Sequence, residues 1–111
     1  MQIDQFRNGQ TPSRSYIGPL TLTRIIAQLC QTPELPQILN ISAPGVVEMG
    51  ALLDGAGLAW SPRPAPEGVI AEVALCTKRL ERYVSFAPEE CTVDGLVAQW
   101  QHYAAQKKAQ K

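Results

Sequence analysis

This chain of 111 residues lacks the features that mark several functional classes. It has no excess charge of either sign, because ten Lys and Arg residues balance ten Asp and Glu residues. No overall field therefore favours nucleic acid or an anionic bilayer as a partner. The three cysteines, Cys30, Cys76 and Cys91, are odd in number and form no C-x-x-C pair, and there is a single histidine. This pattern predicts three reduced thiols, without a disulfide framework or a metal site.

Long apolar runs are also missing. None approaches the roughly 18 residues that a membrane-spanning helix needs, and the polar N-terminus has no apolar core of a signal peptide. The composition, 45% hydrophobic and 18% charged, is typical of a globular chain. We therefore expect a cytoplasmic protein without a membrane or nucleic-acid partner.

The spacing of the apolar residues predicts three or four helices. Thr21, Thr77 and Thr92 are the expected N-caps, since a threonine hydroxyl can accept a hydrogen bond from the first helical turn. Cys30 falls on the apolar face of the first helix, where it is expected to pack as a small hydrophobe. The expected helical residues are 22–30, 49–56, 80–83 and 93–104.

The expected strands are few and short. Residues 14–17 alternate polar and apolar side chains, and 37–43 are mostly apolar, so that this second strand is expected to be buried on both faces. A brief strand is expected at 58–60, and the prolines of 61–68 predict an extended surface path. Such a small sheet is marginal unless something packs against it.

The sequence thus predicts a small, partial α/β unit of a few short strands and three to four helices. Residues 1–13 are expected to form a polar, turn-rich lead-in, with a turn signal at Asn8-Gly9. Residues 14–105 are expected to form the α/β unit itself. The remaining residues, 106–111, are expected to be a frayed basic tail.

Three segments, in a fixed order, each lead from a strand or turn into a helical run. They read Arg14-Ser-Tyr-Ile-Gly-Pro, Leu39-Asn-Ile-Ser-Ala-Pro-Gly and Leu75-Cys-Thr-Lys-Arg-Leu. Together they resemble the last third of the NAD-dependent epimerase/dehydratase family, the extended short-chain dehydrogenases. The corresponding family segments are R-D-[FY]-[IV]-H-V, Y-N-[ILV]-G-x-G and L-D-[TS]-[SAT]-[KR]-[AL]. The resemblance spans residues 6 to 103.

The resemblance implies the C-terminal, substrate-binding lobe of a Rossmann-based enzyme, whose complete form uses NAD(P) and acts on a nucleotide sugar or a similar polar small molecule. It assigns Arg14 and Arg63 to the substrate diphosphate, which suits a guanidinium group because its fork of N–H donors pairs with phosphate oxygens. The chain departs from the family where Cys76 replaces an aspartate and where Pro64, instead of a second arginine, follows Arg63.

The sequence contains no catalytic or cofactor-binding residues that we would assign. A dinucleotide-binding half would carry a Gly-rich turn that opens a helix after a strand, whereas Gly55 and Gly57 end one. Tyr103 and Lys107 match Y-x-x-x-K, but they follow the substrate-lobe motifs and lie near the C-terminus. Neither the adjacent pair Glu89-Glu90 nor His102, which is expected to be exposed, indicates a catalytic arrangement.

We therefore expect a truncated substrate-binding part that neither holds a cofactor nor turns over alone. Its exposed apolar surface, expected at the strand 38–41 and on one helix face, should bind the missing Rossmann half or lead to self-association. The alternative is a stand-alone protein-interaction module derived from such an enzyme. A third possibility, a small active enzyme, would enhance NADH fluorescence on mixing, and we expect no such effect.

Overall fold

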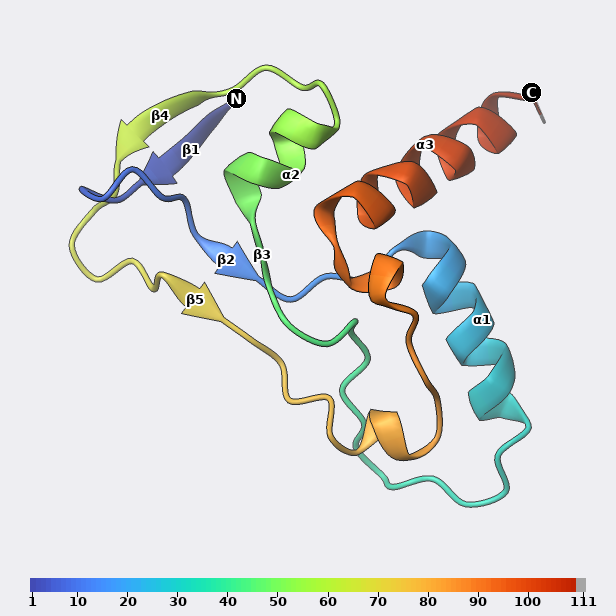
Figure 1. The fold of residues 1–111 in the computed structure, drawn as a ribbon. Coiled ribbons are helices and arrows are strands. Elements are labelled where there is room, and N and C mark those ends of the chain that lie inside the picture. The colour runs from blue at the N-terminus through green and yellow to red at the C-terminus, as the bar shows by residue number, and fades with distance from the viewer. Residues whose placement is uncertain (110–111) are drawn as a thin grey trace.

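The structure, a computed structural model, describes residues 1–109 of the chain. It is a small mixed α/β arrangement, with helices and strands distributed along the whole sequence (Figure 1). The strands are β1 (Gln2–Gln5), β2 (Ser13–Arg14), β3 (Val47–Glu48), β4 (Ser61–Pro64) and β5 (Glu72–Val73). The α-helices are α1 (Pro19–Cys30), α2 (Met49–Gly55) and α3 (Val93–Ala109), and the 3-10 helices are η1 (Leu80–Arg82) and η2 (Pro88–Cys91).

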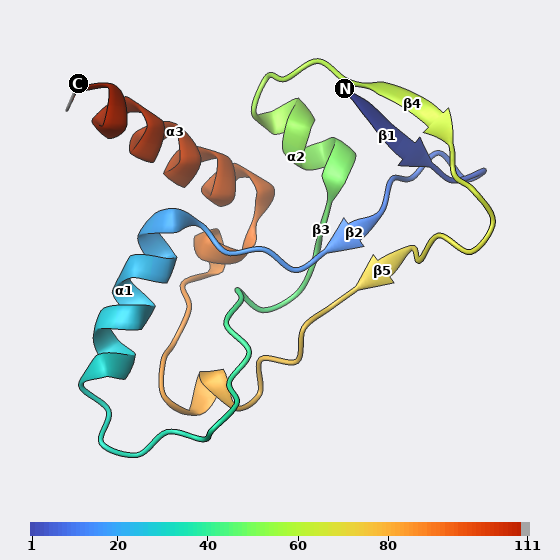
Figure 2. The same cartoon turned by 180° about the vertical axis from the view of Figure 1, so that it is seen from behind.

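The strands form two small sheets. In one, β1 and β4 run parallel, with Gln2 opposite Ser61 and Gln5 opposite Pro64. In the other, the order is β3-β2-β5, with β2 antiparallel to β3 and parallel to β5. Both sheets lie at one end of the molecule, while α1 and α3 lie at the other (Figures 1 and 2).

Helix α1 is confirmed, but it begins two residues before the expected N-cap. Gly18 is the N-cap and Pro19 is the first helical residue, because a proline at this position has a preset φ and lacks an N–H that would in any case be unpaired. Thr21 was therefore wrongly predicted as a cap, and its side chain is buried in the first turn instead. Cys30 is exposed and does not pack as predicted.

The main core lies between α1 and η1. Ile25 and Leu29 of α1 pack with Leu80 of η1 and with Val84, and all four are buried. Ile25 and Leu80 are fully shielded from solvent. The helical period of α1 thus presents Ile25 and Leu29 to Leu80. The predicted cap at Thr77 is wrong, because Arg79 is the residue before η1 and the Thr77 hydroxyl donates to Glu81 Oε2 at 2.8 Å instead.

Helix α3 starts as the sequence predicts. The Thr92 hydroxyl accepts a hydrogen bond from the Gly95 N–H at 3.1 Å, which satisfies one of the free donors of the first turn. Leu96 and Val97 are buried. A side chain on Gly95 would collide with the main-chain carbonyl of Glu89, so this glycine allows η2 to fold closely over the helix start. The predicted tail reaches 110–111, which lie outside the described residues.

Two predicted strands are absent from the described structure. Residues 37–43 form no strand, and Ile38, expected to be buried, is 73% exposed. Pro36 and Pro44 flank this segment and interrupt regular main-chain pairing. Residues 58–60 also form no strand; the extended proline-rich path after them contains β4 instead.

The prolines of β4 fit a parallel ladder because they fall on alternate positions. Ser61 N donates to Met1 O at 2.9 Å, and Ala65 N donates to Gln5 O at 3.1 Å. Pro62 and Pro64 lie between these donors, at positions that face away from β1, where a missing N–H costs no ladder bond. The partner strand β1 occupies the lead-in 1–13, for which only turns were expected. The turn signal at Asn8-Gly9 does mark a turn, with φ of 86° at Gly9.

Polar contacts fix the relative positions of α1, η2 and α3. The Thr21 hydroxyl donates to Glu90 Oε2 at 2.6 Å and accepts from Gln99 Nε2 at 2.7 Å. Glu90 also forms an ion pair with Arg24 at 2.8 Å and accepts from the Ala87 N–H at 2.8 Å. A single carboxylate thus joins the first turn of α1 to the segment that leads into α3.

We predict that Glu90→Gln destabilises the chain by about 1–3 kcal/mol, because the amide loses the ion pair and turns an acceptor into a donor. Urea unfolding measures this change. Glu89→Gln is the matched control, since Glu89 is exposed and is expected to change the free energy of unfolding by less than about 0.5 kcal/mol.

The same carboxylate predicts an acid-sensitive stability. Burial by itself raises the pKa of Glu90, but hydrogen bonds from Thr21, Ala87 and Arg24 outweigh it and hold the pKa below its usual 4.5. Its contribution is therefore present above pH 4.5 and is lost as the pH falls through the lowered value. Glu90→Gln should remove this part of the pH dependence, and an unchanged acid profile would contradict the assignment.

Candidate functional site

The three segments that carry the family resemblance lie side by side around β2. Ala43 N donates to Tyr16 O at 2.9 Å, which places the second segment next to the first. Leu75 N donates to the Ser15 hydroxyl at 2.8 Å, which places the third segment on the other side. Asn40 Nδ2 then reaches Cys76 O at 3.2 Å. Segments distant in the sequence therefore meet at a single short strand.

The third segment continues from a strand that is exposed along its whole length. Every residue from Ile70 to Cys76 is exposed, although five of the seven are Ile, Val, Leu or Ala. We call residues 70–76 the edge segment. Ile70, Val73 and Leu75 are 61%, 41% and 45% exposed. The segment runs along the outside of the molecule in both views (Figures 1 and 2).

The edge segment pairs with β2 on one side only. Ser13 N donates to Ala71 O at 2.8 Å and Ser15 N donates to Val73 O at 3.2 Å. β5 ends the sheet, so within residues 1–109 no strand lies beside its outer edge. This is unusual for parallel pairing, because parallel strands are almost always covered on both faces, and an uncovered apolar edge invites another chain.

The exposed surface of the whole chain is larger than its mass predicts. A monomeric globular protein of 12.1 kDa is expected to expose about 6,000 Å², whereas this chain exposes 7673 Å². Its radius of gyration is 16.0 Å, compared with about 13 Å for a typical domain of this length. The surplus of roughly 1,600 Å² is about twice what each partner buries in a standard protein–protein interface.

Next to the edge segment lies a small cavity of about 230 Å³, lined by Ile38, Asn40, Cys76 and Arg79. Ile38 continues the exposed apolar surface across to the second motif segment. The expectation of an exposed apolar surface at 38–41 is therefore met at Ile38, but most of that surface lies at 70–76, which sequence reasoning did not single out.

Arg14, one of the two predicted substrate ligands, lies in β2 at the edge segment. Its Nη1 donates to Ser13 O at 2.8 Å and to Ala71 O at 3.5 Å. Burial raises the pKa of the Tyr16 phenol, and the positive charge of the nearby Arg14 guanidinium, which lowers this pKa, offsets only part of that effect. Tyr16 is therefore a neutral phenol at neutral pH.

Arg63, the other predicted ligand, lies in the other sheet. Its Nε forms an ion pair with Asp4 Oδ1 at 2.6 Å across the β1–β4 pair. Arg63 lines a broad cavity of about 1020 Å³, together with Phe6 and Arg7 of the turn after β1 and the loop after β4. Arg14 does not line this cavity, so the structure does not bring the two arginines into one pocket.

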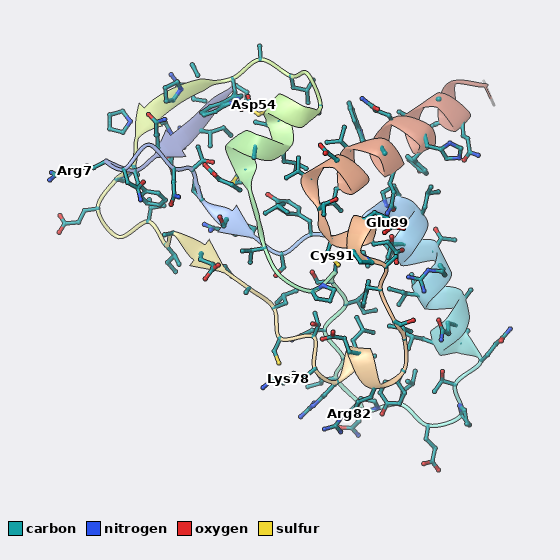
Figure 3. The ribbon with its side chains drawn as sticks, in the orientation of Figure 1. Arg7, Asp54, Lys78, Arg82, Glu89 and Cys91 are labelled. Atoms are coloured by element: carbon teal, nitrogen blue, oxygen red, sulfur yellow. The ribbon has the colours of Figure 1, made fainter. Side chains whose placement is uncertain are left out.

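Of the three cations labelled in Figure 3, only Arg7 lines this cavity. Arg7 projects from the turn after β1, whereas Lys78 precedes η1 and Arg82 ends it, at the opposite end of the molecule (Figure 3). His102, Tyr103 and Lys107 are all exposed on α3. Within the described range 1–109, no cluster of His, Cys, Asp and Glu could hold a metal ion. The same residues include no helix long and apolar enough to cross a bilayer.

The cysteines are unpaired and differ in their surroundings. Cys30 and Cys76 are exposed, while Cys91 is partly buried. Burial raises the pKa of the Cys91 thiol, and the nearby carboxylates of Glu90, Glu81 and Glu89 raise it further. Cys91 is therefore held as a neutral thiol, which is a poor nucleophile.

Comparisons of the chain with protein-family models, with curated proteins and with solved structures found no match.

We predict that Ser15→Ala loosens the edge segment without unfolding the chain. The substitution removes the acceptor of the Leu75 N–H, so hydrogen exchange at Leu75 should accelerate about fivefold, which corresponds to one hydrogen bond of about 1 kcal/mol. Ser85→Ala, at an exposed serine outside the edge segment, is the control and should leave the exchange rate of Leu75 unchanged. Equal exchange rates in both variants would show that the Ser15 hydroxyl does not hold the segment.

Proposed function

We propose that this chain is the substrate-binding C-terminal lobe of an NAD(P)-dependent epimerase/dehydratase-like oxidoreductase, and that a dinucleotide-binding half packs against its edge segment. The observation that carries the proposal is the exposed edge segment, residues 70–76, which is mostly apolar and contains the parallel strand β5. The meeting of the three motif segments around β2 supports it, because the residues of the resemblance are the ones that contact each other.

The edge segment has the parallel pairing and apolar side chains that are typical of a buried strand, but within the described residues no other layer packs on it. Its pairing with β2 is parallel, and parallel strands belong to sheets that are covered on both faces. Only Glu72 is charged in the seven residues. A Rossmann half supplies a covering layer of this kind, because its own parallel sheet is flanked by helices. Docking there would bury Ile70, Val73 and Leu75.

The proposed substrate is a nucleotide sugar, whose diphosphate is anionic and whose base is flat and aromatic. The cavity beside β4 offers Arg63 and Arg7 as cations and Phe6 as an aromatic surface. A guanidinium binds a diphosphate through paired N–H donors. Asp4 forms an ion pair with Arg63, so a diphosphate would have to compete with this ion pair.

The role of this chain in that reaction is binding and orientation. NAD(P) on the other half would supply the hydride chemistry. Arg63 would position the diphosphate, and Arg14, at the junction of β2 with the edge segment, would lie near the docked half and bind the substrate from that side. The proposal gives no residue of this chain a part in proton or hydride transfer.

The alternative is a stand-alone interaction module derived from such an enzyme. Three observations favour it over a working lobe: the ion pair that occupies Arg63, the proline after it, and Cys76 in place of the family's aspartate. The module would use the same edge segment for a protein partner. The coding sequence upstream of Met1 separates the two, since an in-frame strand followed by a Gly-rich turn would support the lobe.

We predict that the chain binds UDP-glucose weakly, with a Kd of roughly 1 mM, as measured by NMR titration. Arg63→Met should weaken binding about tenfold or more, because charged hydrogen bonds contribute about 1.5–3 kcal/mol. Arg82→Met is the matched control, since Arg82 is an exposed arginine of η1 outside the cavity.

Two results would contradict the proposal that this chain is a substrate-binding lobe. Absence of binding at several millimolar UDP-glucose would favour the interaction module. Equal losses in the Arg63 and Arg82 variants would show that any binding is non-specific attraction of an anion.

A further inference from the structure

The apolar face of α3 continues beyond the part of the helix that the rest of the chain covers. Leu96 and Val97 are buried, and Gly55 of α2 approaches Val97 so closely that a side chain there would lie 3.3 Å from its Cγ2. Trp100 and Tyr103 follow at helical spacing on the same side of the helix. They are 45% and 48% exposed. The second half of α3 projects away from the body of the molecule (Figures 1 and 2).

Beside Trp100 lies an apolar groove of about 280 Å³ between α2 and α3. Leu52, Leu53 and Ala56 of α2 form one wall, and Leu96 and Val97 of α3 form part of the other. Leu58, at the groove, is 44% exposed. We call Trp100, Tyr103 and this groove the α3 face. It is separate from the edge segment, which lies at the sheet end.

We propose that the α3 face binds a second copy of this chain, with the two α3 helices antiparallel about a twofold axis near Trp100. A side chain near such an axis meets its own copy, so a charged residue there would face a like charge. No Asp, Glu, Lys or Arg occurs between Asp94 and Lys107, and the net charge of the chain is zero. Two copies of this surface can therefore meet without repulsion between like charges. The dipoles of two antiparallel helices also point in opposite directions, which is favourable.

The surplus surface supports a second interface. The chain exposes 7673 Å², roughly 1,600 Å² above the expected value. One standard interface buries about 800 Å² on each partner, so covering the edge segment accounts for only about half of the surplus. Trp and Tyr are the residues that most often anchor interfaces. The α3 face presents one of each beside an apolar groove.

The proposal is tested by the mass of the full chain in solution, measured by sedimentation equilibrium over a range of concentrations. The wild-type chain should reach twice its 12.1 kDa, with a dissociation constant in the micromolar range. Trp100→Lys and Trp100→Glu should each stay monomeric, because each places like charges across the axis. Far-UV circular dichroism should show that both remain folded.

Mixing the two Trp100 variants tests whether the interface has twofold symmetry. If the interface is twofold near Trp100, equal amounts of the Lys and Glu variants should form heterodimers that neither forms alone, because opposite charges then meet. Ala98→Lys is the matched control on the far side of α3, and Val73→Lys is the control in the edge segment; both should still dimerise.

A monomeric wild-type chain, or dimers that persist in both Trp100 variants, would overturn the proposal. Loss of the dimer in Val73→Lys alone would assign self-association to the edge segment instead. None of these outcomes depends on UDP-glucose, so the dimer and the proposed function can fail separately.

Discussion

The structure depends on the main chain of residues 13–16. Within this stretch, β2 (Ser13–Arg14) pairs with β3 on one side and β5 on the other, and Tyr16 O accepts the N–H of Ala43. Three segments from different parts of the sequence are held together by these few residues. Each pairing covers only two residues per strand, and a sheet of this size is marginal in water. Its stability must therefore come from what packs on it.

At the helical end, the chain supplies that packing itself. Ile25, Leu29 and Leu80 form a buried cluster, and Glu90 joins α1 to the start of α3 through fully satisfied hydrogen bonds. At the sheet end Ile3 and Thr11 are buried, but the edge segment is left uncovered, since every residue from Ile70 to Cys76 is exposed. The contrast between a closed helical end and an open edge segment is the physical basis of our proposal that another half packs against the edge segment.

The sequence predicted what local physics determines. The helical period located α1 and α3, and the Thr92 cap followed from its hydroxyl chemistry. Thr21 was assigned wrongly because Pro19 starts the helix earlier. The strand predicted at 37–43 does not form, because apolar side chains alone do not supply a neighbouring strand for main-chain hydrogen bonds. The edge segment could not be recognised as exposed, since exposure depends on which other elements are present, and the two arginines gave no local sign that they lie in different sheets.

The heat-capacity change of unfolding, measured by calorimetry on the dilute, monomeric chain, tests the central claim most directly, because it reports the surface that folding buries. A self-sufficient domain of 111 residues would show about 1.3 kcal/mol/K or more. We expect a clearly smaller value, with a van't Hoff enthalpy that does not match the calorimetric one. A full-sized value with matching enthalpies would show that the chain is complete by itself and would contradict the account.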